Sequence, residues 1–130
     1  MRPRSKYNVD QTPAGKLRRS HKGRTYSSAA EHDHAVRLDL DPTIELVIPQ
    51  PTFWMGDDFG EYRADFLVIE AMPETEVHCA GFAHYAVEVK GYRESERWRM
   101  VRDRLWSRYG PCPLHVVKNG ATVSVIEGQR

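Results

Sequence analysis

The spacing of apolar residues changes twice between positions 85 and 118, and this change limits the folds open to the chain. "YAVEVKGY" (85–92) alternates as a strand does, whereas the apolar residues of 93–109 recur at helical spacing. "PLHVVKNG" (113–120) is strand-like again. A strand, a helix and a second strand in one sheet form a right-handed crossover with parallel strands. The pattern therefore predicts an α/β fold in which helices flank a small mixed sheet.

The helix over 93–109 is predicted to end at Gly110-Pro111, since proline cannot continue a helix. The residues at helical spacing form an apolar stripe that should face the core: Trp98, Val101, Leu105 and Tyr109. Beyond it, Asn119-Gly120 is a strong signal for a hairpin between two short strands.

Upstream, Ser28 is predicted to cap a helix that Pro42 ends, and Glu31 completes a capping-box pattern. A strand ending at Pro49 follows. "YRADFLVIEA" (62–71) is predicted as a second strand, and apolar residues on both of its faces favour a central position. The segment 72–84 is predicted to be a hairpin or a loop.

The length of 130 residues suits one compact domain. Residues 1–25 lack apolar periodicity and contain several glycines and prolines. We therefore expect a flexible basic arm over 1–25 and a single domain over 26–130.

Composition excludes several classes of protein. No apolar run approaches the roughly 18 residues of a membrane span, and no signal-peptide pattern opens the chain. Cys79 and Cys112 are the only cysteines, too few for a disulfide framework and not spaced as a zinc motif. We expect a cytoplasmic protein with no membrane partner.

The net charge of +1 hides an uneven distribution. Residues 1–26 are strongly basic, 57–76 are acidic, and 93–108 are basic again. This arrangement is typical of a protein that binds a polyanion, although a solvated surface with a disordered tail gives the same pattern. The candidate phosphate contacts are Arg18, Arg19, Lys22 and Arg24 in the arm, and Arg93, Arg97 and Arg104 in the helix.

A charge pair inside the strand 85–92 has no evident structural use. Residues two apart in a strand share a face, so Glu88 and Lys90 project together. Asp65 lies in another apolar strand, and two adjacent strands would bring Asp65 close to Glu88. Like charges that close repel unless a cation lies between them. The alternative is a surface salt bridge between Glu88 and Lys90.

Mg²⁺ takes oxygen ligands, and the backbone carbonyl of Val89 could join the carboxylates of Asp65 and Glu88. Phosphodiester hydrolysis is the chemistry that uses such a set, because the metal polarises the phosphoryl group and activates a water. Lys90 would orient that water or neutralise charge on the phosphorus centre.

Asp65 followed by Glu88-Val89-Lys90 resembles the signature of the PD-(D/E)XK nuclease superfamily. "YSSAAE", "QPTF", "YRADF" and "VEVKGY" resemble, in order and context, small phage endonucleases, including phage and archaeal Holliday junction resolvases. The resemblance covers roughly residues 24–118. Ala64 replaces the usual proline, and the connection from Asp65 to Glu88 is longer than in the smallest members.

The resemblance implies a restriction-endonuclease-like core and a Mg²⁺ cofactor, with Mn²⁺ as a possible substitute. Asp65 and Glu88 would be metal ligands and Lys90 the catalytic lysine. Glu31 would be a catalytic carboxylate on the first helix, with the capping box as the alternative. Gln50 would be an auxiliary polar residue, or else a strand-end glutamine facing water.

The function expected from this resemblance is a metal-dependent, structure-selective DNA endonuclease, a phage Holliday junction resolvase acting in the host cytoplasm. Symmetric cutting of a four-way junction needs two sites, so a homodimer is expected. One alternative is a less selective endonuclease acting on duplex, nicked or flap DNA. Another is a non-catalytic DNA-binding module that keeps the nuclease fold.

Overall fold

The structure, a computed structural model, describes residues 10–72, 81–90 and 94–129. Its elements are α1 (Pro13–Arg18), β1 (Ser20–His21), β2 (Arg24–Thr25), α2 (Ala29–Leu40), β3 (Ile44–Pro49), β4 (Thr52–Trp54), β5 (Glu61–Arg63), β6 (Phe66–Met72), β7 (Gly81–Val89), α3 (Glu96–Tyr109), β8 (Leu114–Lys118) and β9 (Ala121–Ile126). Within the described ranges, no helix is both long enough and apolar enough to cross a bilayer.

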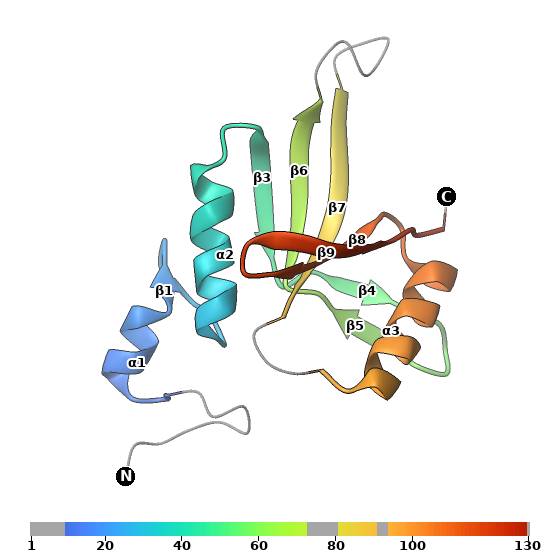
Figure 1. The fold of residues 1–130 in the computed structure, drawn as a ribbon, viewed down its shortest axis with the longest axis horizontal. Coiled ribbons are helices and arrows are strands. Elements are labelled where there is room, and N and C mark those ends of the chain that lie inside the picture. The colour runs from blue at the N-terminus through green and yellow to red at the C-terminus, as the bar shows by residue number, and fades with distance from the viewer. Residues whose placement is uncertain (1–9, 73–80, 91–93, 130) are drawn as a thin grey trace.

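A five-stranded sheet forms the centre of the molecule, in the order β3-β6-β7-β8-β9 (Figure 1). β7 and β8 run parallel, and the other neighbouring pairs are antiparallel. The predicted mixed sheet and parallel pair are therefore confirmed. The predicted hairpin is confirmed as well, because Asn119 and Gly120 join β8 to β9 with φ angles of 53° and 79°.

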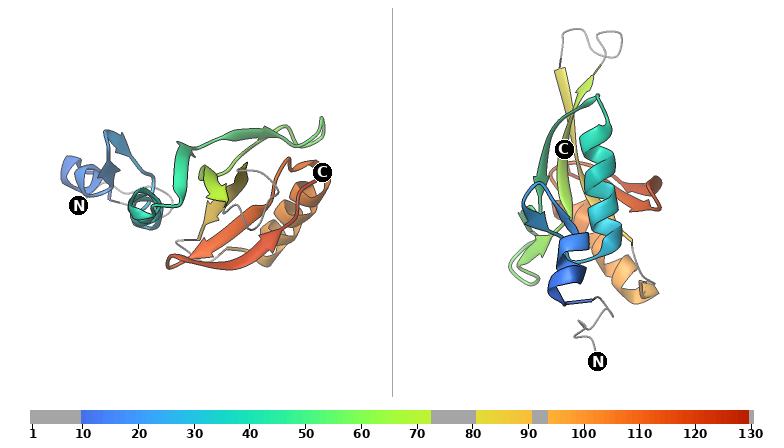
Figure 2. Two further views of the ribbon diagram at one scale, coloured as in Figure 1. Left: turned by 90° about the horizontal axis from the view of Figure 1, so that it is seen from above. Right: turned by 90° about the vertical axis from the view of Figure 1, so that its left-hand side faces the viewer.

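The helices α2 and α3 cover different faces of this sheet (Figures 1 and 2). On the first face, the α2-side cluster consists of Tyr26, Ala35, Leu38, Phe66, Val68, Val87 and Val117. On the second, the α3-side cluster consists of Met55, Tyr62, Ala64, Ala86, Trp106, Cys112 and Leu114. Consecutive residues of β7 enter different clusters, as the alternation of side chains along a strand requires.

The boundaries of α2 agree with the prediction. The Ser28 side chain accepts a hydrogen bond from the Glu31 backbone N–H at 3.1 Å, which satisfies one of the free donors at the start of the helix. The helix ends at Leu40, two residues before Pro42.

The predicted stripe of α3 is confirmed for Trp98, Leu105 and Tyr109, which pack against the α3-side cluster, and is wrong for Val101. Val101 is 40% exposed, whereas Arg102 and Trp106 are buried. The Trp106 indole N–H donates to the Cys112 carbonyl at 2.7 Å, which allows the polar edge of the ring to be buried. An apolar template cannot anticipate a buried arginine, since Arg102 depends on ion pairs with Glu94 and Asp103.

The predicted unstructured arm over 1–25 is wrong for residues 13–25, which form α1 and the β1–β2 hairpin. Residues 1–9 lie outside the described ranges. Arg19 ties this region together, because its guanidinium donates to the carbonyls of Asp10 and Tyr26, the latter at 2.9 Å. These backbone contacts have no signature in the spacing of apolar residues.

The single strand predicted for 62–71 is divided into β5 and β6. β5 pairs with β4 in a separate two-stranded sheet, while β6 joins the central sheet. The chain bends at Ala64 and Asp65 on one side and at Gln50, whose φ is 54°, on the other. The chain therefore leaves the central sheet after β3, forms β4 and β5 beside α3, and returns to the central sheet at β6 (Figure 1).

The third predicted strand, 85–92, corresponds to β7, which begins earlier, at Gly81. Gly91 and Tyr92 lie outside the described residues, as do positions 73–80 of the predicted excursion. That excursion connects two antiparallel strands, since Met72 of β6 lies opposite Gly81 of β7.

Candidate functional site

The predicted site residues meet at one end of the sheet, where β3 ends, β6 begins and β7 ends. The Asp65 carbonyl accepts from the Gln50 N–H at 2.8 Å, and the Asp65 N–H donates to the Val87 carbonyl at 2.9 Å. Glu88 follows Val87 directly. The backbone thus sets Gln50, Asp65 and Glu88 side by side across three strands.

The Asp65 carboxylate is half-buried and is held in place by β7. Its Oδ2 accepts a hydrogen bond from the Val89 backbone N–H at 2.6 Å. Burial, followed by repulsion from Glu88 and Glu31, raises the pKa of Asp65 to about 8, against the opposing effect of the Val89 hydrogen bond. The raised pKa shows that the surrounding protein groups compensate the negative charge of ionised Asp65 poorly.

The Glu88 carboxylate is fixed by a residue that the sequence reasoning missed. Tyr62, buried in the α3-side cluster, donates a hydrogen bond from its hydroxyl to Glu88 Oε2. Burial raises the pKa of Glu88 to about 7, opposed by the Tyr62 hydrogen bond and by the Arg102 charge. Burial together with the Glu88 charge raises the pKa of Tyr62, so its hydroxyl keeps its proton and remains a donor.

Glu31 lies in the first turn of α2, close enough to Asp65 and Glu88 for its charge to raise the pKa of both. Its own pKa is raised by burial, despite hydrogen bonds from Ser27 that lower it. The Ser27 hydroxyl donates to Glu31 Oε1 at 2.8 Å. The Ser28 cap fits the alternative interpretation, in which Glu31 belongs to a capping box. The Glu31 carboxylate itself, however, bonds to Ser27 and lies near Asp65 and Glu88.

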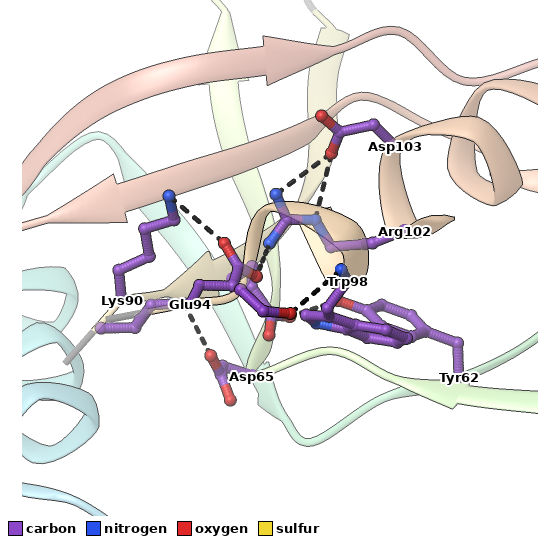
Figure 3. A network of polar contacts seen from close by, with 10 residues as sticks. Tyr62, Asp65, Lys90, Glu94, Trp98, Arg102 and Asp103 are labelled. Atoms are coloured by element: carbon purple, nitrogen blue, oxygen red, sulfur yellow. Dashed lines mark hydrogen bonds and ion pairs between the residues drawn. The ribbon is translucent and has the colours of Figure 1, made fainter. Parts of the chain in front are cut away.

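Lys90 forms its ion pair with Glu94 and not with Asp65 or Glu88 in the residues described. Its Nζ lies 3.2 Å from Oε2 of Glu94, and Glu94 also accepts from the buried Arg102 (Figure 3). Arg102 in turn donates through Nε and Nη2 to Asp103 Oδ1, each at 3.1 Å. The cation that lowers the pKa of Glu88 is Arg102.

The sequence contained a usable signal for these missed residues. Trp98, Arg102 and Trp106 are four positions apart and share one helical face, and Glu94 continues that spacing toward Lys90. Nothing local marks Tyr62, which reaches Glu88 only because β4 and β5 bend toward α3.

The donor set suits a hard cation. Among the described residues, no group of three or more His, Cys, Asp or Glu side chains is arranged to hold a metal ion. Asp65 and Glu88 nevertheless provide two adjacent carboxylates, with one oxygen of each bound to a protein donor. Mg²⁺ is commonly held by one or two carboxylates together with waters and substrate phosphates, so this pair fits the ion.

The predicted phosphate contacts differ in their availability. Arg19 is 6% exposed and bonded to backbone carbonyls, so its prediction as a surface contact is wrong for this structure. Arg18 pairs with Asp10 at 3.1 Å and Lys22 pairs with Asp39. Arg18 and Lys22 stay exposed despite these ion pairs, as do Arg24 at the N-terminal hairpin and Arg97 and Arg104 on α3, while Arg93 lies outside the described residues.

No protein-family model, curated protein or solved structure matches this chain.

Proposed function

We propose that the chain is a metal-dependent DNA endonuclease that hydrolyses phosphodiester bonds. The observation that carries this proposal is the placement of Asp65, directly before β6, beside Glu88 of β7: burial raises the pKa values of both groups, and repulsion from Glu88 raises that of Asp65 further. Retaining two half-buried carboxylates in this state is costly to the fold, and a bound divalent cation would remove the cost. A mixed sheet between two helices is compatible with the restriction-endonuclease-like core that the sequence resemblance implies.

The carboxylates of Asp65 and Glu88 would hold Mg²⁺, or Mn²⁺ in its place, with the Val89 carbonyl as a further ligand. When bound, such an ion supplies Lewis acidity toward the phosphoryl group and lowers the pKa of a coordinated water. One oxygen of Glu88 is bonded to the Tyr62 hydroxyl and one oxygen of Asp65 to the Val89 N–H, which leaves the other oxygen of each carboxylate to bind the metal. Glu31 would accept a proton or orient water from the α2 side, and Gln50 would contribute an auxiliary polar group beside Asp65.

Lys90 would neutralise charge that develops on the phosphoryl oxygens. Lys90 directly follows the last residue of β7, two positions after Glu88, and its ammonium lies 3.2 Å from Glu94.

For the substrate, we propose branched DNA, in particular a four-way junction, cut by a homodimer. The exposed arginines of α3 can contact phosphates, and the described residues contain no helix that resembles a base-reading module. Recognition would then depend on the path of the DNA backbone. A less selective endonuclease would use the same carboxylates on duplex or flap DNA.

The test is cleavage of labelled junction, flap and linear duplex DNA with Mg²⁺ or with EDTA. Asp65→Asn and Glu88→Gln should each lower the cleavage rate by about 1000-fold, or roughly 4 kcal/mol in activation free energy. DNA affinity should be retained, because removing a carboxylate reduces repulsion of phosphate.

Glu70→Gln is the matched control. Glu70 lies near the far end of β6, whereas Asp65 directly precedes the first residue of that strand.

Junctions should bind at least about tenfold more tightly than duplex, a difference of ~1.4 kcal/mol. Equal cutting of duplex and junction by a monomer would contradict the resolvase proposal alone. Metal-independent cutting, or full activity of Asp65→Asn, would overturn the nuclease site.

A further inference from the structure

A buried arginine, Arg102, lies in the middle of α3, four residues after Trp98 and four before Trp106. Arg102 is 2% exposed, which is unusual because a charge taken out of water is costly unless it is paired. All three of its nitrogens donate to carboxylates: Nη1 to Glu94, and Nε and Nη2 to Asp103. An apolar side chain at this position would fill the same space without requiring partners, so the arginine needs an explanation other than packing.

Glu94 connects this buried charge to Lys90. Its two carboxylate oxygens are divided between the two cations, with Oε1 accepting from Arg102 and Oε2 lying 3.2 Å from Lys90 Nζ. The Glu94 side chain is 12% exposed and that of Lys90 22% exposed, so the pair is partly shielded from solvent. In Figure 3 the Glu94 carboxylate lies between the Lys90 ammonium and the Arg102 guanidinium.

This network borders the carboxylate pair. The Arg102 and Glu94 charges act on Glu88 in opposite directions, the first lowering its pKa and the second raising it. The four members of the network, Lys90, Glu94, Arg102 and Asp103, sum to zero formal charge. The network can therefore fix Lys90, two residues after Glu88, without supplying a net positive charge to Asp65 and Glu88.

We propose that Glu94 and Arg102 are positioning residues for Lys90. Arg102 fixes the Glu94 carboxylate against α3, and Glu94 holds the ammonium of Lys90, which follows β7 two residues after Glu88. A lysine side chain has four rotatable bonds, and this anchor selects one direction for it before substrate arrives. The catalytic part of this inference rests on the proposed function, whereas the anchoring of Lys90 does not.

The anchoring can be tested without any cleavage. Competitive acetylation of the lysines by limiting acetic anhydride, followed by peptide mass spectrometry, measures the reactivity of each amine. Lys90 should be acetylated about threefold faster or more in Glu94→Gln and in Arg102→Met than in the wild-type chain, since an ion-paired ammonium reacts slowly. Lys118, exposed at the end of β8, provides the internal reference.

The matched control is Glu96→Gln, which removes the same charge from an exposed position two residues from Glu94. It should leave the reactivity of Lys90 unchanged. If Arg102→Met fails to fold, as judged by circular dichroism, Glu94→Gln alone decides. Wild-type reactivity of Lys90 in Glu94→Gln would overturn the anchoring.

A double-mutant cycle on cleavage tests the positioning role. Glu94→Gln should lower kcat about tenfold with little change in KM, and it should have no further effect in a Lys90→Met background. Additive effects of the two substitutions, or an unchanged or higher kcat in Glu94→Gln, would overturn the positioning role. A wild-type chain that cuts no DNA would remove the proposed function, while the acetylation result would still decide whether Glu94 anchors Lys90.

Discussion

The two faces of the central sheet use the same strands for different purposes. On the α2 side, Val87 of β7 packs into a cluster of aliphatic and aromatic side chains with Phe66 and Val68. On the α3 side, Ala86 packs against Trp106, and the next residue on that face is Glu88, bonded to Tyr62 and bordered by Arg102. Because side chains alternate along β7, one strand serves an apolar core on one face and a polar network on the other.

The difference indicates which substitutions affect stability and which affect chemistry. The buried polar group contributed by α2, His34, has its pKa lowered by burial, so it is held toward the neutral form. The α3 side instead buries a charged guanidinium and needs carboxylates to pair it. Buried ion pairs are often less stabilising than apolar residues of the same volume. The charges of the α3 side are therefore expected to have a function other than stability.

Substitution of Leu38 by alanine should produce the largest change in stability. Leu38 is 7% exposed on α2, two turns from Glu31, and its truncation leaves a cavity in the α2-side cluster. The free energy of unfolding, measured by urea denaturation, should fall by about 3 kcal/mol. The cleavage rate of the folded fraction should not change, because no member of the polar network contacts this side chain among the described residues.

Tyr62→Phe is the comparison variant on the α3 side. It retains the ring in its cluster and removes only the hydroxyl that donates to Glu88. Its unfolding free energy should fall by only about 1 kcal/mol, while its cleavage rate falls more than that of Leu38→Ala. The reverse ranking of the two variants in cleavage would contradict the division between the faces.

Much of this architecture could be predicted from local patterns. The period change around 85–118 predicted the parallel pair of β7 and β8, Ser28 predicted the start of α2, and Asn119-Gly120 predicted the β8–β9 turn. Each depends on residues near one another in the chain, where propensity and patterning are informative. Asp65 and Glu88 could be predicted as neighbours because Asp65 directly precedes β6, and β6 pairs with β7.

The rest depends on tertiary contacts. "YRADFLVIEA" has the composition of one strand, and the bend that divides it arises from backbone hydrogen bonds of Ala64 and Asp65 with Pro51, Gln50 and Val87. Arg102 stands where a core template expects an apolar residue, and Arg19 stands in a stretch with the composition of a disordered arm. Both are buried because backbone carbonyls or carboxylates accept hydrogen bonds from their guanidinium groups, and the spacing of apolar residues does not reveal such contacts.

The two faces should also differ in the sign of their response to pH. Asp65 and Glu88 have pKa values raised to about 8 and about 7, so the folded state binds their protons more tightly than the unfolded state does. The free energy of unfolding in EDTA should therefore fall by several kcal/mol as the pH rises from 5 to 8. His34 has a lowered pKa, so its contribution is lost in the opposite direction, as the pH falls below its ordinary value of 6.5.

Urea denaturation at pH 5, 6.5 and 8 measures this linkage. Asp65→Asn should flatten the decline between pH 5 and 8, because asparagine does not titrate. Mg²⁺ should stabilise the wild-type chain at pH 8 more than at pH 5, since the carboxylates must be ionised to bind it. A stability that rises from pH 5 to pH 8 in EDTA and is insensitive to Asp65→Asn would contradict the raised pKa values.

The smallest expected effects concern the outer surfaces of the two helices. The exposed side of α3 carries Arg97 and Arg104, whereas α2 exposes Arg37 among acidic neighbours that include Asp33 and Asp39. If the α3 side faces DNA, each arginine that contacts a phosphate contributes about 0.9 to the slope of log K against log salt concentration. Arg97→Gln and Arg104→Gln should each lower the slope by about that amount, and together by about 1.8, in binding titrations between low and moderate salt. Arg37→Gln, which removes the same charge from the other helix, should leave the slope unchanged. A loss of slope in Arg37→Gln but not in the α3 variants would move the DNA to the α2 side and reverse the assignment of the two faces.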